Sequence, residues 1–227
     1  MTLRITAAIA ALIAGTSAAF ADEVRVYNWS DYIEESLLEK FTAETGIKII
    51  YDVFDSNEVL ETKLLAGGTG YDVVVPSASF LQRQIQAGVF QPLDKSQLSN
   101  LGNVWDAVTD RTEQYDPSGA YSVNYMWGTT GIGYNTEKVE QALGANAPTS
   151  SLALVFDPAN AEKLSECGFY MLDAPTEMIP AALAYLGKNP DSQDADDIRA
   201  AGEVLAAVRP FITKFDSSEY ISALANG

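Results

Sequence analysis

Residues 24–33 read VRVYNWSDYI, and this stretch decides the fold. Val24 and Val26 alternate with polar Arg25, which is the period of a short β-strand. Residues 29–32 form the turn that follows, and apolar residues at helical spacing then predict a helix to about Thr45, with a glycine next where a C-terminal cap belongs. The stretch therefore predicts a strand, a turn and a helix.

The same order of elements repeats further along the chain. Strands are predicted over 47–53 and 72–75, a capping box at 55–58 begins a helix that Gly67-Gly68 ends, and Ser77 or Ser79 begins a helix that Gly88 ends. The result is a β-α-β-α-β unit, for which right-handed crossovers are expected. Ligands of such sheets bind beyond the carboxyl ends of the strands, which directs attention to the loops 29–32 and 76–79.

The second half of the chain has a different pattern of predicted elements. Residues 89–120 look irregular, and 121–126 and 129–135 have the pattern of two strands, which suggests a crossing into a second domain. We expect an α/β domain over 22–130 and another over 131–227. The later elements predicted are helices at 136–143, after Thr176 and at 194–208, strands at 169–172 and 211–215, and a last helix that Ser217 caps.

The N-terminus has the pattern of a secretion signal. Arg4 precedes an apolar run over 5–14, and Ala19-Phe20-Ala21 fits the small-x-small cleavage rule, which predicts cleavage before Asp22. The apolar run is shorter than the about 20 residues that span a bilayer. We therefore expect a periplasmic product with no membrane insertion after cleavage.

Composition excludes several classes of function. The chain has 31 acidic against 14 basic residues, so it repels nucleic-acid phosphates and attracts cations weakly, although plain solubility also explains such a balance. It has no histidine and a single cysteine, Cys167, which excludes Ser-His-Asp and Cys-His catalysis and histidine metal sites. Cys167 is either a buried thiol or pairs with a cysteine outside this sequence.

The loop after the first strand combines groups that suit an organic ammonium ion. Asp31 supplies charge, the Ser30 hydroxyl accepts a hydrogen bond, and the rings of Trp29 and Tyr32 supply cation–π attraction of about 0.5–2 kcal/mol. The alternative is structural: Ser30 or Asp31 caps the following helix and Trp29 packs in the core. The four residues by themselves leave both interpretations open.

An equivalent loop occupies 173–177 in the second half. Asp173 and Glu177 either face a cleft or only favour the start of a helix through its dipole. A carboxylate from each domain would match a molecule with a cation at each end. Ser77 and Ser79 either cap a helix or contact an amine through oxygen, because a helix N-terminus itself repels a cation.

Seven stretches of the sequence carry a likeness to a known family: 27–33, 41–48, 51–58, 71–80, 88–95, 125–135 and 172–175. They resemble the periplasmic polyamine-binding proteins of ABC importers. The likeness covers nearly all of 22–227, and a Ser-Asp pair after the tryptophan is similar to the putrescine-binding branch. The resemblance implies a two-domain α/β fold of the type II periplasmic-binding-protein kind that closes around the amine, with ligand contacts at Trp29, Ser30, Asp31, Ser77 and Glu177.

The sequence departs from the family in two places. Leu152 stands where the family usually has a tryptophan, which affects packing in the second domain. The family also continues beyond Gly227 and returns to the first domain, and a putrescine-type member carries a second cysteine shortly after this point. The resemblance therefore predicts that this sequence is a fragment that lacks the second crossover and the C-terminal part. The second cysteine would then be the disulfide partner of Cys167.

We interpret the chain as a solute-binding protein that captures putrescine or a related polyamine and delivers it to the permease of an ABC importer, with no catalysis, cofactor or metal. Two alternatives remain. One is a binding or sensing protein for another cationic amine, such as spermidine or agmatine. The other is an enzyme built on carboxylates, which needs two acids with separated pKa values, and nothing in the sequence marks such a pair.

Overall fold

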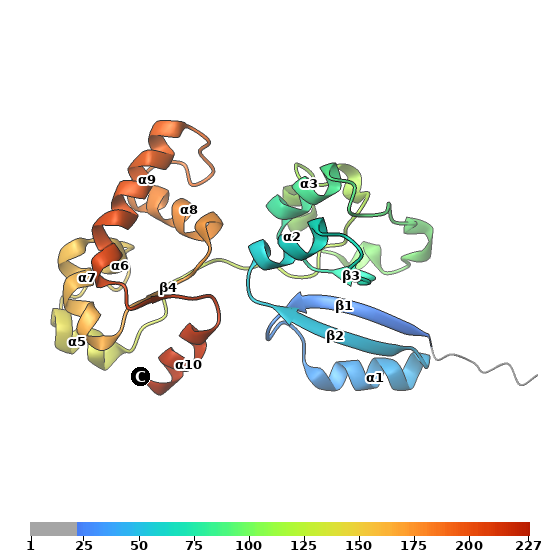
Figure 1. Cartoon of the computed structure of the whole chain (residues 1–227), viewed down its shortest axis with the longest axis horizontal. Helices are drawn as coiled ribbons and strands as arrows, with labels where there is room; N and C mark the ends of the chain where they lie inside the picture. Colours follow the sequence, from blue (N-terminus) through green and yellow to red (C-terminus); the bar gives the residue numbers. More distant parts are fainter. Residues whose placement is uncertain (1–21) are drawn as a thin grey trace, which may run out of the picture.

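The computed structural model describes residues 22–227, so the predicted signal peptide and its cleavage site lie outside the described residues. Figure 1 shows two groups of elements joined by an extended segment. We call the group formed by residues 22–120 lobe 1 and the group formed by residues 136–227 lobe 2. Each lobe has its own parallel sheet with helices packed on it, which confirms the predicted α/β class. The domain boundary between residues 130 and 131 stays a prediction.

Lobe 1 is built on a three-stranded parallel sheet with strand order β2-β1-β3. The central strand β1 pairs along its whole length with β2, from Glu23 opposite Lys48 to Trp29 opposite Phe54. All three strands therefore end at the same edge. The elements are β1 (Glu23–Trp29), α1 (Glu35–Thr45), β2 (Lys48–Phe54), α2 (Asn57–Leu65), β3 (Val73–Val74) and α3 (Ala78–Gln86).

Local signals explain most of these boundaries. Gly46 ends α1 with a φ of 75°, a left-handed conformation that glycine adopts at no steric cost. The predicted capping box is wrong by one position, because Ser56 and not Asp55 is the N-cap of α2 and accepts the backbone N–H of Val59. Asp55 hydrogen bonds elsewhere, with lobe 2.

The core of lobe 1 forms between α2 and the sheet. Leu60 and Leu64 of α2 are buried against Tyr27 and Phe54. The rings of Tyr27 and Phe54 meet edge to face at 4.9 Å. This packing holds α2 against the carboxyl-terminal halves of β1 and β2.

The two strands predicted over 121–126 and 129–135 do not form. Both stretches are irregular in the structure and run along the cavity between the lobes. The alternating pattern does favour extended backbone, but a strand also needs a hydrogen-bonded neighbour, and none lies beside this segment among residues 22–227. Residues 89–120 are largely irregular as predicted, with α4 (Asp106–Thr112) and the 3₁₀ turns Lys95–Gln97, Leu101–Asn103 and Pro117–Gly119.

Lobe 2 has a short two-stranded parallel sheet covered by helices. Its core contains the fully buried Leu183 and Val208, from α8 and α9. The helices α6 and α7 were not predicted. The elements are α5 (Thr136–Leu143), α6 (Ala153–Phe156), α7 (Pro158–Leu164), the 3₁₀ turn Ser165–Cys167, β4 (Tyr170–Met171), α8 (Pro175–Tyr185), α9 (Ala195–Val208), the 3₁₀ turn Arg209–Phe211, β5 (Lys214–Phe215) and α10 (Glu219–Asn226).

The last helix begins differently from the prediction. Ser218, not Ser217, is the N-cap of α10, and its side chain makes no capping hydrogen bond. The Asp216 carboxylate accepts the backbone N–H groups of Ser218 and Glu219 instead. Cys167 is a half-buried thiol without a disulfide in the described part of the chain. Across residues 22–227, no helix combines the length and apolarity needed to cross a bilayer.

Candidate ligand-binding site

A cavity of about 2280 Å³ lies between the two lobes. Several of its polar lining residues follow the carboxyl ends of strands from both sheets, as expected for α/β folds. The volume exceeds the about 300–1,000 Å³ of sites that enclose a small molecule, so the described residues form an open cleft. The strand-end residues that line it are Ser30 and Asp31 after β1, Asp55 after β2, Ser77 after β3, Glu177 after β4 and Ser217 after β5.

The loop after β1 presents aromatic faces beside a carboxylate. The indole N–H of Trp29 donates to the Val75 carbonyl over 2.8 Å, and its ring lies 5.9 Å from that of Tyr32. Asp31 has a φ of 61°, and its exposed carboxylate makes no hydrogen bond or ion pair within residues 22–227. The N-cap of α1 is Glu34, so the alternative is wrong in making Ser30 or Asp31 the cap of this helix. Its other part is confirmed, because Trp29 packs against the core of lobe 1, with its ring 4.7 Å from that of Phe54.

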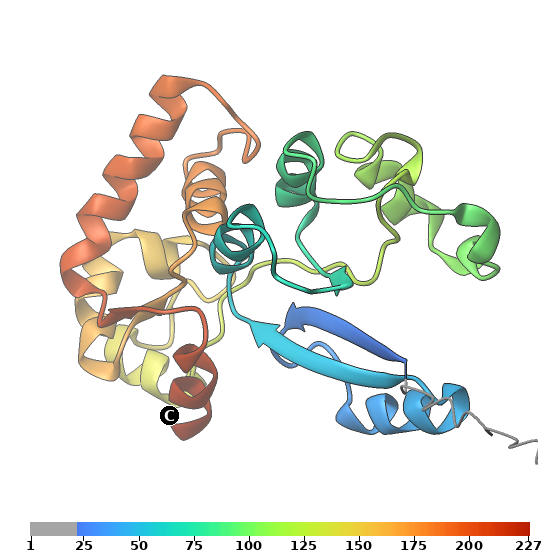
Figure 2. The ribbon, with the colours of Figure 1, turned by 45° about the vertical axis from the view of Figure 1, so that its right-hand side comes forward.

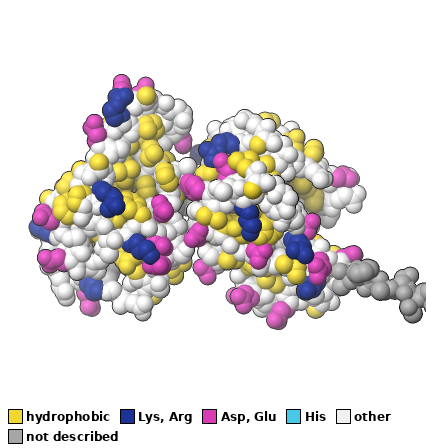
Figure 3. All heavy atoms as spheres, viewed as in Figure 1, with side chains coloured by type: hydrophobic (Ala, Val, Ile, Leu, Met, Phe, Trp, Pro, Cys, Tyr) yellow, Lys and Arg dark blue, Asp and Glu magenta, His cyan; other side chains and the backbone are white. Residues whose placement is uncertain are grey.

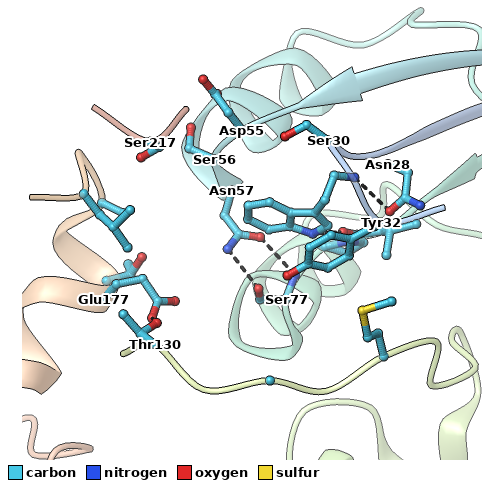
Figure 4. Close-up of a pocket in the computed structure, with 18 of the residues that line it drawn as sticks. Asn28, Ser30, Tyr32, Asp55, Ser56, Asn57, Ser77, Thr130, Glu177 and Ser217 are labelled. Atoms are coloured by element: carbon cyan, nitrogen blue, oxygen red, sulfur yellow. Dashed lines mark hydrogen bonds between the residues drawn. The ribbon is translucent and has the colours of Figure 1, made fainter. Parts of the chain in front are cut away.

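Ser77 lies at the N-cap of α3 but makes no capping hydrogen bond through its side chain. Its Oγ accepts from Asn57 Nδ2 over 3.0 Å, and its backbone N–H donates to Asn57 Oδ1 over 2.9 Å. Figure 4 shows both bonds, with Ser77 facing the space between the lobes. The second predicted serine, Ser79, does not line the cavity.

Glu177 reaches the cavity from lobe 2. It lies in the first turn of α8, where the helix dipole favours a carboxylate. The Thr130 hydroxyl donates to Glu177 Oε2, so the connecting segment orients this side chain (Figure 4). Asp173, the other acid of the same loop, is exposed and does not line the cavity.

The structure thus brings all five predicted contacts, Trp29, Ser30, Asp31, Ser77 and Glu177, to one cavity. Sequence reasoning missed Asp55 and Glu58, which line the same cavity and hydrogen bond with lobe 2. The position of Asp55 directly after β2 is the signal that could have identified it, because it is equivalent to the positions of Asp31 and Ser77, whereas Glu58 lies in the first turn of α2. The roles of the five predicted residues in ligand binding stay predictions.

The electrostatics of the cavity favour a cation. Six carboxylates line it, and Lys138 is the one basic side chain among the lining residues in the described range. Burial raises the pKa of the Tyr51 hydroxyl, so this lining group stays neutral at physiological pH. The acids are Asp31, Asp55, Glu58, Asp72, Asp94 and Glu177.

The face of the molecule drawn in Figure 3 shows no large patch of a single charge. On the face drawn in Figure 3, acidic and basic side chains are dispersed over both lobes. Within residues 22–227, no three acidic or cysteine side chains come together in a way that could hold a metal ion. The cavity lining offers carboxylates, hydroxyl oxygens and aromatic faces, which are the groups that contact an organic cation.

Comparisons with known proteins agree on one family. The family model described as "Bacterial extracellular solute-binding protein" matches residues 36–227. The chain is 56% identical over 220 residues to the putrescine-binding periplasmic protein SpuD of Pseudomonas aeruginosa strain UCBPP-PA14, covering 96% of this chain and 60% of that protein. It is 52% identical over 224 residues to the putrescine-binding periplasmic protein PotF of Escherichia coli strain K12, covering 98% and 60%.

A solved structure supports the same fold. The TpPotD lipoprotein of Treponema pallidum matches with a TM-score of 0.75 and 30% identity, over 90% of this chain and 61% of that one. The fold is therefore of the type II periplasmic-binding-protein kind, as the resemblance implied. The chain spans about 60% of the length of the relatives it matches.

Proposed function

The chain belongs to the bacterial extracellular solute-binding proteins, and from that premise we propose that it captures putrescine, or a closely related polyamine, for an ABC importer. SpuD and PotF, which are 56% and 52% identical to it over 220 and 224 residues, are named putrescine-binding proteins, and this supports the choice of ligand. The family consists of solute-binding proteins rather than enzymes. We also propose that this chain catalyses no reaction.

One observation carries the proposal: a carboxylate from each lobe lines the same cavity. Asp31 enters from lobe 1 and Glu177 from lobe 2. Putrescine has a primary ammonium at each end, so each carboxylate can pair with one ammonium through charge-assisted hydrogen bonds. Pairing both ends would draw the lobes together, because the ligand then contacts both at once.

The aromatic groups of lobe 1 add a second attraction. Trp29 and Tyr32 form a tilted ring pair beside Asp31, and an ammonium over such faces gains about 0.5–2 kcal/mol. The Ser77 hydroxyl offers an oxygen to the same ammonium. A chain of four methylenes between the charges suits the apolar parts of the lining, since burying methylene groups is itself favourable by about 0.8 kcal/mol each.

The location of the protein forms part of the proposal. We place it in the periplasm after cleavage of the signal peptide behind Ala21, because Ala19-Phe20-Ala21 fits the cleavage rule. Its relatives SpuD and PotF are named periplasmic. The partner proposed for delivery is the membrane permease of the importer.

The test is a ligand panel on the full gene product. Calorimetry and thermal denaturation compare putrescine, spermidine and agmatine with n-butylamine, which has the same chain and a single ammonium. Putrescine should raise the melting temperature as RT ln(1 + [L]/Kd) requires, and n-butylamine should bind at least tenfold more weakly because one carboxylate stays unpaired. Equal affinity for the two amines, or no putrescine binding, contradicts the proposal.

A further inference from the structure

Both polar atoms of the Asn57 side chain form hydrogen bonds with Ser77. Asn57 is the first residue of α2 and only 4% exposed. Its amide makes two hydrogen bonds with one residue 20 positions away: Oδ1 accepts the Ser77 backbone N–H over 2.9 Å, and Nδ2 donates to Ser77 Oγ over 3.0 Å. This pair of bonds joins the loop after β2 to the loop after β3 (Figure 4).

The direction of these two bonds follows from chemistry. A backbone N–H is only a donor, so the amide oxygen of Asn57 must face it. The amide nitrogen, also only a donor, must then face Ser77 Oγ. Ser77 Oγ therefore accepts from Asn57, and it keeps one lone pair and its own proton for the cavity.

This arrangement matters because of where Ser77 lies. The N-terminus of a helix carries unpaired N–H groups and partial positive charge, which repel an ammonium. Asn57 Oδ1 covers the N–H of Ser77 at the start of α3, and Asn57 Nδ2 holds the hydroxyl oxygen in place. The Ser77 N–H is thus paired, and the Ser77 hydroxyl oxygen is held as an acceptor at the cavity.

We propose that Asn57 is a positioning residue for cation binding, which makes the Ser77 hydroxyl a pre-oriented acceptor for a ligand ammonium. The inference rests on the proposed function, because it requires an ammonium in this cavity. Asn57 acts through Ser77 and needs no contact with the ligand. Preorganised partners of a contact residue raise affinity because the contact residue loses less freedom on binding.

The experiment is a double-mutant cycle on putrescine affinity in the full gene product, measured by calorimetry. Asn57→Ala and Ser77→Ala should each weaken binding on the order of tenfold, as expected for a hydrogen bond to a charged group. The double variant should be about as weak as either single variant, because Asn57 works only through the hydroxyl. A purely structural role of Asn57 would give losses that multiply.

Two further variants make the cycle specific. Asn57→Asp keeps an acceptor for the Ser77 N–H, and its second carboxylate oxygen can accept the hydrogen bond from the Ser77 hydroxyl. Both lone pairs of Ser77 Oγ are then left for the ammonium. The putrescine affinity of this variant should therefore at least equal that of the unsubstituted protein. Asn160→Ala removes a side-chain hydrogen bond to the Ala153 carbonyl in lobe 2 and should lower the melting temperature without changing affinity.

The outcomes separate this inference from the proposed function. Failure of the unsubstituted protein to bind putrescine overturns both. Binding by the unsubstituted protein together with multiplying losses, or with an unchanged affinity of Asn57→Ala, overturns the role of Asn57 alone. If Asn57→Ala does not fold, Asn57→Asp decides: a tenfold loss of affinity in that variant contradicts the inference.

Discussion

The Thr176 hydroxyl donates a hydrogen bond to Glu58 Oε1 over 3.2 Å, although the two residues are 118 positions apart. A second bond of the same kind joins Ser218 Oγ to Asp55 Oδ2 over 2.7 Å. The acceptor Asp55 lies in the loop after β2 and the acceptor Glu58 lies at the start of α2, both in lobe 1. Both donors belong to lobe 2. Figures 1 and 2 show α2 beside the beginning of α8 in both views. These two bonds link the lobes across the cavity.

The first prediction concerns these bonds. The double variant Thr176→Val and Ser218→Ala removes both donors, each worth about 0.5–1.5 kcal/mol, so the ligand-free protein should spend more time with its lobes apart. Small-angle X-ray scattering should show a larger radius of gyration. Thr149→Val, an exposed threonine of lobe 2 that makes no side-chain hydrogen bond within residues 22–227, is the control. Identical scattering of the double variant and the unsubstituted protein would show that the bonds do not set the lobe distance.

The second prediction concerns Glu177. Glu177→Gln removes the charge that we pair with one ammonium, and removing one partner of a buried ion pair costs about 3–5 kcal/mol, so putrescine affinity should fall by at least a hundredfold. Apo stability should hardly change, because glutamine keeps an oxygen that accepts the Thr130 hydroxyl. Calorimetry and thermal denaturation measure the two quantities. Glu166→Gln, an exposed acid outside the cavity, should leave both unchanged, and the idea fails if the two variants bind alike.

The third prediction is a dependence on pH at α10. Hydrogen bonds from the Glu219 and Ser218 N–H groups, with help from Lys214, lower the pKa of Asp216 below its ordinary value of 3.8. A carboxyl group whose pKa is lower in the folded state stabilises the fold above its unfolded pKa, and this stabilisation is lost as the pH falls through the folded pKa. We therefore expect α10 to loosen below about pH 4.

Amide hydrogen exchange of α10 between pH 6 and pH 3 measures this effect, after correction for the intrinsic rates. Asp216→Asn should flatten the dependence, because the titrating group is gone. Asp110→Asn changes an exposed acid of α4 whose carboxylate makes no hydrogen bond within the described range, and it should leave the profile of α10 as it is. The same profile in Asp216→Asn as in the unsubstituted protein would assign the effect to another group.

The fourth prediction tests the proposed domains, 22–130 and 131–227. Leu60 and Leu183 are both fully buried, one in the core of each lobe. Truncation of either to alanine should cost about 2–5 kcal/mol. If the lobes are separate cooperative units, Leu60→Ala should accelerate amide exchange in lobe 1 alone and Leu183→Ala in lobe 2 alone. Equal acceleration in both lobes by either variant would mean a single unit.

Local signals predicted the elements of this fold well where a helix or strand depends on its own residues. The helix over Thr136–Leu143 was predicted with its observed bounds, and its N-cap Asn135 accepts the Lys138 N–H. Asp194 likewise caps the helix predicted to start there. Caps and apolar periodicity act within a few residues, so they can be read from the chain.

Predictions failed where the outcome depends on a distant partner. The segment 121–135 has the pattern of strands but finds no neighbouring strand within 22–227 and lines the cavity instead. Asp55 looked like a helix cap but hydrogen bonds with Ser218, which is 163 positions away. A local sequence pattern indicates which backbone conformation is favoured. It does not indicate which distant residue will lie beside that segment in the fold.

The sequence by itself determined the class of the fold and the strand-end loops, because parallel strands place their carboxyl ends on one edge whatever the rest of the chain does. The five candidate contacts came from the resemblance to a known family, since the residues alone left structural alternatives open. Only the tertiary structure decided that Asn57 holds Ser77, that Glu58 meets Thr176, and that Glu177 lies in the cavity while Asp173 does not. These are contacts between segments 20 to 118 residues apart, and their geometry is set by the packing of whole elements rather than by any local preference.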